Sequence, residues 1–287
     1  MTYGTPRALR VALEQRLLTR SNASGVGLDR LRRRVIFERI VARLQGAEPG
    51  RWVLKGGMAL EARLGDDARL TKDIDVGLRD DLVGAAELHD RLIDVLTVDS
   101  DGDGFIFAAG SPVELREDGG GHLTWRVKID ADLGGKPFGR IQLDVSPRAH
   151  ELTATDSITL PNSLDFAGIP APVVEIIDVH RHAAEKLHAM LRDFGDRENS
   201  RVRDLVDLVI LIEHGLLDPM TVAAAGRQVW SERDGARPPA VLPPLPESWP
   251  GRYERHATDH ALEARSFPVA VALVAALWAE MFPTEET

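Results

Sequence analysis

The stretch Trp52-Val53-Leu54-Lys55-Gly56-Gly57-Met58-Ala59-Leu60, followed by Thr71-Lys72-Asp73-Ile74-Asp75, decides the fold. An apolar run, a glycine pair and a helical segment predict a strand, a turn and a helix. The second stretch is a predicted strand, in which successive side chains point to opposite faces, so Asp73 and Asp75 share one face while Ile74 enters the core. A divalent cation such as Mg²⁺ fits between two such carboxylates and substrate phosphates. The bare backbone N–H groups of Gly56 and Gly57 can approach a triphosphate closely.

A third carboxylate, Asp144, lies in the β-rich run Ile141–Val145. Its apolar neighbours would bury it unless it faces a site. Three carboxylates from two strands can hold two metal ions, one near the acceptor hydroxyl and one near the leaving pyrophosphate. The simpler alternatives are a strand-end turn for Asp73 and Asp75, and a solvated sheet face for Asp144.

Composition and charge narrow the class of protein. The 287 residues are 44% hydrophobic and include no cysteine, which excludes disulfides, thiolate metal sites and cysteine nucleophiles. We expect a cytoplasmic protein, because the N-terminus lacks a secretory pattern and the apolar run at residues 269–279 is too short to cross a bilayer. The net charge is −10, yet residues 1–43 hold ten arginines against three acids. This basic segment is either an RNA-binding surface or a pair of helices with solvated arginine faces.

The remaining pattern predicts an α+β protein with an α/β domain over residues 1–170 and a helical domain over 171–287. Helices are expected on both sides of Asn22–Gly27 and over Leu82–Val98, and strands between Gly104 and Val145. The predicted later helices are Glu175–Leu191, Arg201–His214, Pro219–Trp230 and Thr258–Met281, the last broken or kinked at Pro268.

Two charged groups lie on these later helices. Lys186 has apolar neighbours, and a lysine on a buried helix face needs an anion, which could be a nucleotide phosphate or a salt bridge to Glu185 or Asp204. Arg203 and Asp207 are four residues apart and could form an intrahelical ion pair, while Asp204 could reach Lys186 or a nucleotide.

Over residues 50–255, the chain resembles the polymerase-β-type nucleotidyltransferases, and within them the AbiEii/MenT group of toxins from bacterial toxin–antitoxin systems. The resemblance rests on Lys55-Gly56-Gly57, Thr71-Lys72-Asp73-Ile74-Asp75, Asp144, Glu185-Lys186-Leu187-His188-Ala189 and Arg201-Val202-Arg203-Asp204-Leu205-Val206-Asp207-Leu208. The proline-rich loop that ends in Trp249 and Tyr253 is also similar. The implied fold is a mixed sheet with flanking helices, plus a C-terminal helical bundle.

The resemblance implies a Mg²⁺- or Mn²⁺-dependent enzyme that moves a nucleoside monophosphate from an NTP to an acceptor, with the tRNA 3′ end as the expected acceptor and an antitoxin as partner. The implied catalytic residues are Asp73, Asp75, Asp144, Lys186 and Asp204, of which the first three would bind metal. The implied nucleotide-binding residues are Lys55, Gly56, Gly57, Thr71, Lys72, Lys186 and Arg203. In related toxins, a hydroxyl residue placed like Thr71 can be phosphorylated by the antitoxin, which would block the site.

Two other functions are compatible with the sequence. The acceptor could be a small molecule of the aminoglycoside type or a protein hydroxyl, or the chain could be an inactive nucleotide-binding interaction protein.

Two further patterns in the sequence resemble metal sites but favour structural roles. Asp99–Gly104 begins like a calcium loop but lacks the glutamate at the twelfth position, and His180, His182 and His188 lack the spacing of a zinc site.

Overall fold

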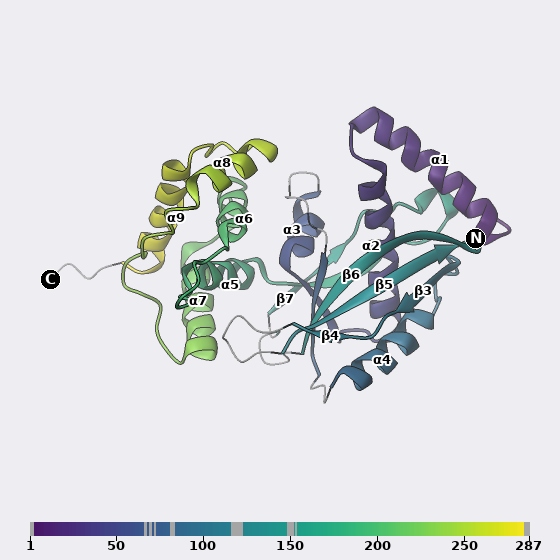
Figure 1. Cartoon of the computed structure of the whole chain (residues 1–287), viewed down its shortest axis with the longest axis horizontal. Coiled ribbons are helices and arrows are strands. Elements are labelled where there is room, and N and C mark those ends of the chain that lie inside the picture. Colours follow the sequence, from purple (N-terminus) through teal and green to yellow (C-terminus); the bar gives the residue numbers. More distant parts are fainter. Residues whose placement is uncertain are drawn as a thin grey trace. The chain divides into compact units, whose positions relative to one another are not determined.

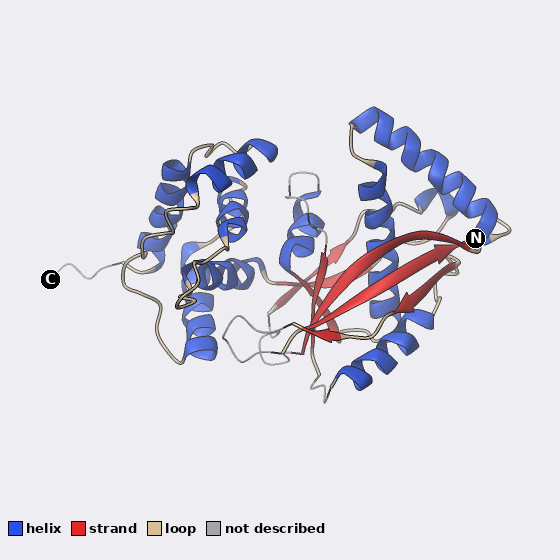
Figure 2. Ribbon diagram, viewed as in Figure 1, coloured by secondary structure: helices blue, strands red, loops and turns tan. Residues whose placement is uncertain are grey.

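The computed structural model describes residues 3–65, 68, 71, 73–80, 84–115, 123–147, 152 and 154–283. The chain divides into two compact units, and the main boundary falls between Ile176 and Ile177. The first unit contains a large mixed sheet with helices, and the second is mainly helical (Figure 2). The expected α+β class is confirmed.

The sheet of the first unit has eight strands in the order β3-β5-β6-β2-β1-β8-β7, with β4 paired to β5. The strands are β1 (Trp52–Lys55), β2 (Asp73–Leu78), β3 (Phe105–Ala109), β4 (Val113–Glu114), β5 (Trp125–Leu133), β6 (Lys136–Pro147), β7 (Thr155–Thr159) and β8 (Val173–Ile177). β2 is antiparallel to β1 and parallel to β6. β5 and β6 form a long antiparallel hairpin in which apolar and polar residues alternate along β5, so one face of it is buried.

The helices of the first unit are α1 (Pro6–Ser24), α2 (Leu28–Ala47), α3 (Gly56–Leu64) and α4 (Ala85–Thr97). α2 packs against β6 and α4, α4 packs against β3, and α1 packs against α2 (Figure 1). The Thr5 side chain caps α1 by accepting a hydrogen bond from the Ala8 backbone N–H, 3.2 Å away, and Gly25 ends the helix in the left-handed conformation.

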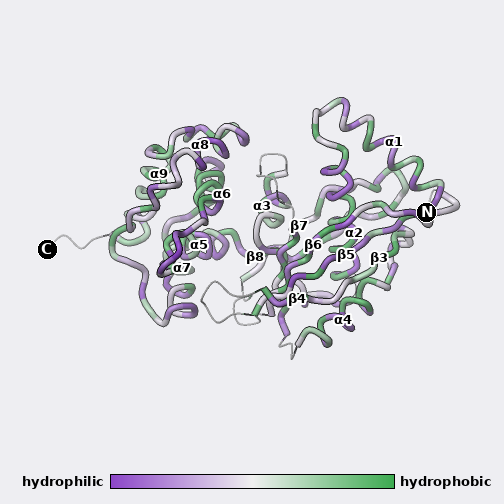
Figure 3. The backbone as a smooth tube through the Cα atoms, in the orientation of Figure 1, coloured by the Kyte–Doolittle hydropathy of each residue, from purple (hydrophilic) through white to green (hydrophobic). Residues whose placement is uncertain are grey.

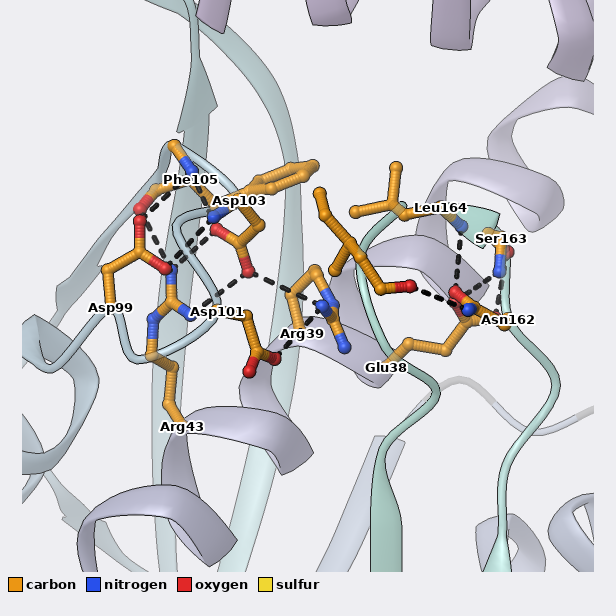
Figure 4. A network of polar contacts seen from close by, with 12 residues as sticks. Glu38, Arg39, Arg43, Asp99, Asp101, Asp103, Phe105, Asn162, Ser163 and Leu164 are labelled. Carbon is orange, nitrogen blue, oxygen red and sulfur yellow. Dashed lines mark hydrogen bonds and ion pairs between the residues drawn. The ribbon is translucent and has the colours of Figure 1, made fainter. Parts of the chain in front are cut away.

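The loop that resembles a calcium site is instead tied to two buried arginines of α2 (Figure 4). Arg43 donates to both oxygens of the fully buried Asp103, at 3.0 and 2.6 Å, and pairs with Asp99 at 2.9 Å. Arg39 pairs with Asp101 at 3.3 Å. Because arginine supplies the cation, these acids join α2 to the turn before β3 and need no metal.

The second unit contains α5 (Val179–Leu191), α6 (Val202–Glu213), α7 (Pro219–Asp234), α8 (Pro250–Asp259) and α9 (Phe267–Met281). α5 packs against α6 and α7, while α9 packs against α6, α7 and α8. α6 is mostly hydrophobic, as its green colour in Figure 3 shows, and most of its residues are buried. It therefore forms the centre of this unit.

Two predicted helices were wrong in extent. Glu175 lies in β8, because Val173–Ile177 is rich in β-branched residues, and α5 begins only after Asp178, whose side chain caps it. The segment predicted as one helix from Thr258 to Met281 is split, since α8 ends at Asp259 and α9 begins at Phe267. The expected break is present, but it lies before Pro268 and no kink occurs there. Pro268 is in the first turn of α9, where its missing N–H costs nothing.

Candidate active site

The glycine turn between β1 and α3 lies directly against Asp75. Gly56 has a φ of +59°, which favours glycine, and a Cβ atom added there would come within 1.9 Å of Asp75 Oδ2. Both the backbone conformation and the space available therefore require glycine. Gly57 is buried in the first turn of α3. The structure thus brings the predicted turn and the second carboxylate together.

Four charged residues lie side by side across neighbouring strands. Lys55 of β1 is opposite Asp75 of β2, Asp75 is opposite Asp144 of β6, and Asp144 is opposite Arg126 of β5. Side chains directly opposite one another point to the same face of a sheet, so the register places two carboxylates between two cations. Lys55 and Asp144 are each only 8% exposed. We call these four residues the charged row.

Asp73 lies two residues before Asp75 on the same face, as predicted, and Ile74 between them is fully buried. The hydroxyl of Thr71 donates to the backbone carbonyl of Asp73, with 3.3 Å between the oxygens. Thr71 is thus tied to the start of β2 and remains half-buried. Lys72, predicted to bind nucleotide, lies outside the described residues.

Arg126 is a site residue that the sequence analysis missed. Its Nε and Nη2 atoms donate to the two oxygens of Asp144, at 2.8 and 2.7 Å, and Nη2 is 3.9 Å from Asp73. The hydrogen bond to Asp144 raises the pKa of the Arg126 guanidinium above its usual range. The alternation Trp125-Arg126-Val127 placed Arg126 on the polar face of a strand, but only the cross-strand register shows which carboxylate it meets.

The two carboxylates of Asp73 and Asp75 are suitable ligands for a hard divalent cation. Among the described residues, no group of three or more acidic or histidine side chains could hold a metal ion. Asp73 and Asp75 offer two carboxylates on one face of β2, and Mg²⁺ is commonly held by one or two carboxylates together with substrate phosphates. The residues present therefore fit a metal that arrives with a triphosphate.

The other predicted site residues gather in the second unit. Lys186 is 5% exposed, and its Nζ atom donates to Asp207 Oδ2 at 2.5 Å and to Asp204 Oδ1 at 3.3 Å. Asp207 is fully buried. The ion pair considered for Lys186 and Asp204 is present, and Asp207 turns inward to Lys186. Arg203 lies on the exposed side of α6.

Most contacts of the N-terminal arginines are internal to the first unit. Arg10 donates to the backbone carbonyls of Leu133, Lys136 and Pro137, and the Arg16 guanidinium lies 3.9 Å from the centre of the Phe166 ring. Further partners are found for Arg32 with Glu14, Arg34 with Glu61, Arg39 with Asp101 and Arg43 with Asp103. Much of this positive charge therefore stabilises the fold, which weakens the case for a broad RNA-binding surface here.

The fold is similar to that of a solved nucleotidyltransferase toxin. The nucleotidyltransferase toxin MenT4 from Mycobacterium tuberculosis H37Rv aligns with a TM-score of 0.57 and 20% sequence identity, covering 96% of this chain and 90% of that chain. An antigenic nucleotidyltransferase-like protein from Paracoccidioides brasiliensis has a TM-score of 0.37 and 16% identity, covering 70% of this chain and 88% of that chain. No curated protein matches the sequence.

The class of protein, a nucleotidyltransferase, follows from a family match. Residues 39–284 match the family described as "Nucleotidyl transferase AbiEii toxin, Type IV TA system". The chain therefore belongs to the AbiEii family of toxin–antitoxin nucleotidyltransferases, as its resemblance indicated, and the family implies an antitoxin as partner. In the part of the chain that the structure describes, we find no helix that could span a membrane.

Proposed function

We propose that this protein transfers a nucleoside monophosphate from an NTP to the 3′ end of tRNA in the cytoplasm, and that Mg²⁺ or Mn²⁺ is required. The observation that carries the proposal is the position of Asp75, which lies between the Gly56 turn and Asp144. A triphosphate over the glycine turn would therefore lie beside the carboxylates. Lys55 and Arg126 flank the acids and supply positive charge on the same face.

Asp73 and Asp75 are the proposed metal ligands. The metal would supply charge neutralisation at the phosphates and at the leaving pyrophosphate. Lys55, Gly56, Gly57, Thr71 and Lys72 are the proposed contacts of the nucleotide from the first unit. Fixed positive groups and backbone N–H groups accelerate such transfers because they are positioned before the reaction begins.

Asp144 is the proposed base for the acceptor hydroxyl and a third metal ligand. Both of its oxygens accept hydrogen bonds from Arg126, so either role requires Arg126 to release it. In the second unit, Lys186, Asp204 and Arg203 are the proposed contributors to nucleotide binding. Their support is the family motif, together with the burial of Lys186 between two acids, which fixes the position of its ammonium group.

The proposal is tested by incubating the protein with total tRNA and each NTP separately, then sequencing the RNA 3′ ends. Wild-type protein should add nucleotides and release pyrophosphate, and Asp75→Ala should do neither. Asp90→Ala removes an exposed acid of α4 and is the matched control. Pyrophosphate release with unmodified RNA would point to a small-molecule or protein acceptor, whereas no release with any acceptor class would favour an inactive nucleotide-binding protein.

A further inference from the structure

A basic groove lies within the second unit, between the start of α6 and one face of α8. It encloses about 740 Å³. Its charged lining consists of Arg201, Arg203, Arg252 and Arg255 with Asp204 and Asp259. We call it the α6–α8 groove. Four arginines face two acids in a chain whose net charge is −10, so positive charge is concentrated here.

The sequence of α8 explains how the groove is built. Arg252, Arg255 and Asp259 follow one another at intervals of three and four residues and therefore share one face of the helix. Tyr253 and Ala257 lie on the opposite face and are fully buried. The helix is thus amphipathic, with its apolar side packed into the unit and its charged side lining the groove.

Hydrogen bonds fix the position of each wall of the groove. The Trp249 indole N–H, at the start of α8, donates to the backbone carbonyl of Asn199 at 2.8 Å. The Asn199 side-chain amide donates to three carbonyls at the end of α5, of Ala189, Met190 and Arg192, each at 3.0 Å. The Tyr253 hydroxyl donates to the carbonyl of Ala264 at 2.7 Å. The backbone that carries the arginines is therefore held in place, which lowers the entropy lost when a ligand binds.

The charge of the groove is available to a ligand. Among the described residues, neither Arg203 nor Arg255 forms an ion pair, and both are exposed. One of the two acids, Asp204, already accepts from Lys186. The start of α6 adds the partial positive charge of a helix N-terminus to the same end of the groove. An anion of high charge density is the ligand that this combination favours.

We infer that the α6–α8 groove binds the phosphodiester backbone of the acceptor RNA through Arg252 and Arg255 of α8, next to Arg203 and Asp204, which are the proposed nucleotide contacts. This inference rests on the proposed function and identifies where its acceptor would bind. Arg252 and Arg255 lie on α8, and Arg201 and Arg203 lie at the start of α6, so arginines line both walls of the groove. Cations spread over two walls suit successive backbone phosphates, whereas an NTP presents one compact triphosphate. The N-terminal arginines are poorer candidates because so many of them have internal partners.

The test compares the double variant R252A/R255A with R237A/R265A, which removes two exposed arginines of the same unit outside the groove. The affinity of each for a fluorescent tRNA acceptor-stem hairpin is measured by anisotropy at several KCl concentrations. We expect R252A/R255A to bind at least about tenfold more weakly, and the slope of log affinity against log salt to fall by about 1.4, from two lost single-strand phosphate contacts. The control should bind like the wild type.

Additional measurements separate this inference from the proposed function. Arg255→Glu, which reverses one exposed charge, should weaken RNA binding on its own, and thermal unfolding checks that each variant is folded. NTP affinity should be unchanged in R252A/R255A. Loss of NTP affinity with unchanged RNA affinity would assign the groove to the triphosphate and overturn the inference. Normal RNA binding and RNA modification by R252A/R255A would also overturn it while leaving the proposed function intact. A wild-type protein that does not bind the hairpin would remove the inference altogether.

Discussion

Replacing Gly56 by alanine should abolish nucleotidyl transfer by displacing one carboxylate. Two effects add at this position. The φ of +59° costs a residue with a Cβ atom about 1–2 kcal/mol. In addition, the new methyl group would lie 1.9 Å from Oδ2, 2.7 Å from Cγ and 2.9 Å from Cβ of Asp75. Three atoms of one short side chain cannot yield without moving the carboxylate by more than about 1 Å, a displacement that can reduce the rate of an oriented reaction by about 100-fold.

Gly65 separates the two effects. Its φ of +62° is nearly the same, but no atom lies within 4 Å of an added Cβ. Gly65→Ala should therefore share the backbone cost and keep its activity within a few-fold of wild type, while Gly56→Ala should release pyrophosphate from NTP at least about 100-fold more slowly. Both rates are measured beside thermal unfolding. If the two variants lose activity equally, or if Gly56→Ala stays active, catalysis does not depend on the position of the Asp75 carboxylate next to this turn.

Three further predictions concern buried or neighbouring charges. Lys186→Met leaves the fully buried Asp207 without its ammonium partner and should lower the free energy of unfolding by about 3–5 kcal/mol. The double variant Lys186→Met/Asp207→Leu should recover most of this loss, because it also removes the buried carboxylate. Urea titrations measure both changes. Burial raises the pKa of Glu38 to about 7, so the folded protein binds that proton more tightly than the unfolded chain. The contribution of Glu38 to stability should therefore be full below about pH 4.5 and be lost as pH rises through about 7. Relative to wild type, Glu38→Gln should gain stability over this range, by up to about 3 kcal/mol at pH 8, and equal pH profiles of the two proteins would refute this assignment. Thr71→Glu should reduce transfer at least about tenfold by placing negative charge beside Asp73, and it should reduce transfer more than Thr71→Val, which removes only the hydroxyl. An equal loss in the two variants would contradict the role of charge.

Local patterns predicted the residues that alternation and backbone conformation control. The run Asp73-Ile74-Asp75 requires a strand with Ile74 inside, and the structure buries Ile74 completely. The glycine pair after Trp52–Lys55 requires a turn into a helix, and α3 begins at Gly56. These features depend on neighbours in the sequence, which are visible before any tertiary contact is known.

Features that depend on pairing between distant segments could not be predicted from the sequence. Arg126 and Asp144 are 18 residues apart, and only the register of β5 with β6 makes them partners. The predicted helix Glu175–Leu191 includes the last three residues of β8, because a short β-branched run next to a long helical pattern is ambiguous without its sheet neighbour β1. The ten N-terminal arginines suggested a polyanion partner, since a charge count cannot distinguish a solvated arginine from Arg43, which is buried against Asp103.

The pairing of β2 with strands on both sides explains why Asp73 and Asp75 keep pointing to the same face of the sheet. β2 is paired on both sides, with β1 through Lys55 and Asp75 and with β6 through Asp75 and Asp144. A slip of one residue would turn both carboxylates of β2 into the core and Ile74 and Val76 toward the charged face. Such a slip would bury two charges without the flanking Lys55 and Arg126 and expose two apolar side chains, and both changes cost several kcal/mol. The same register that aligns the acids with their cations is therefore the register that the hydrophobic core requires, so the site is held in place by the stability of the sheet.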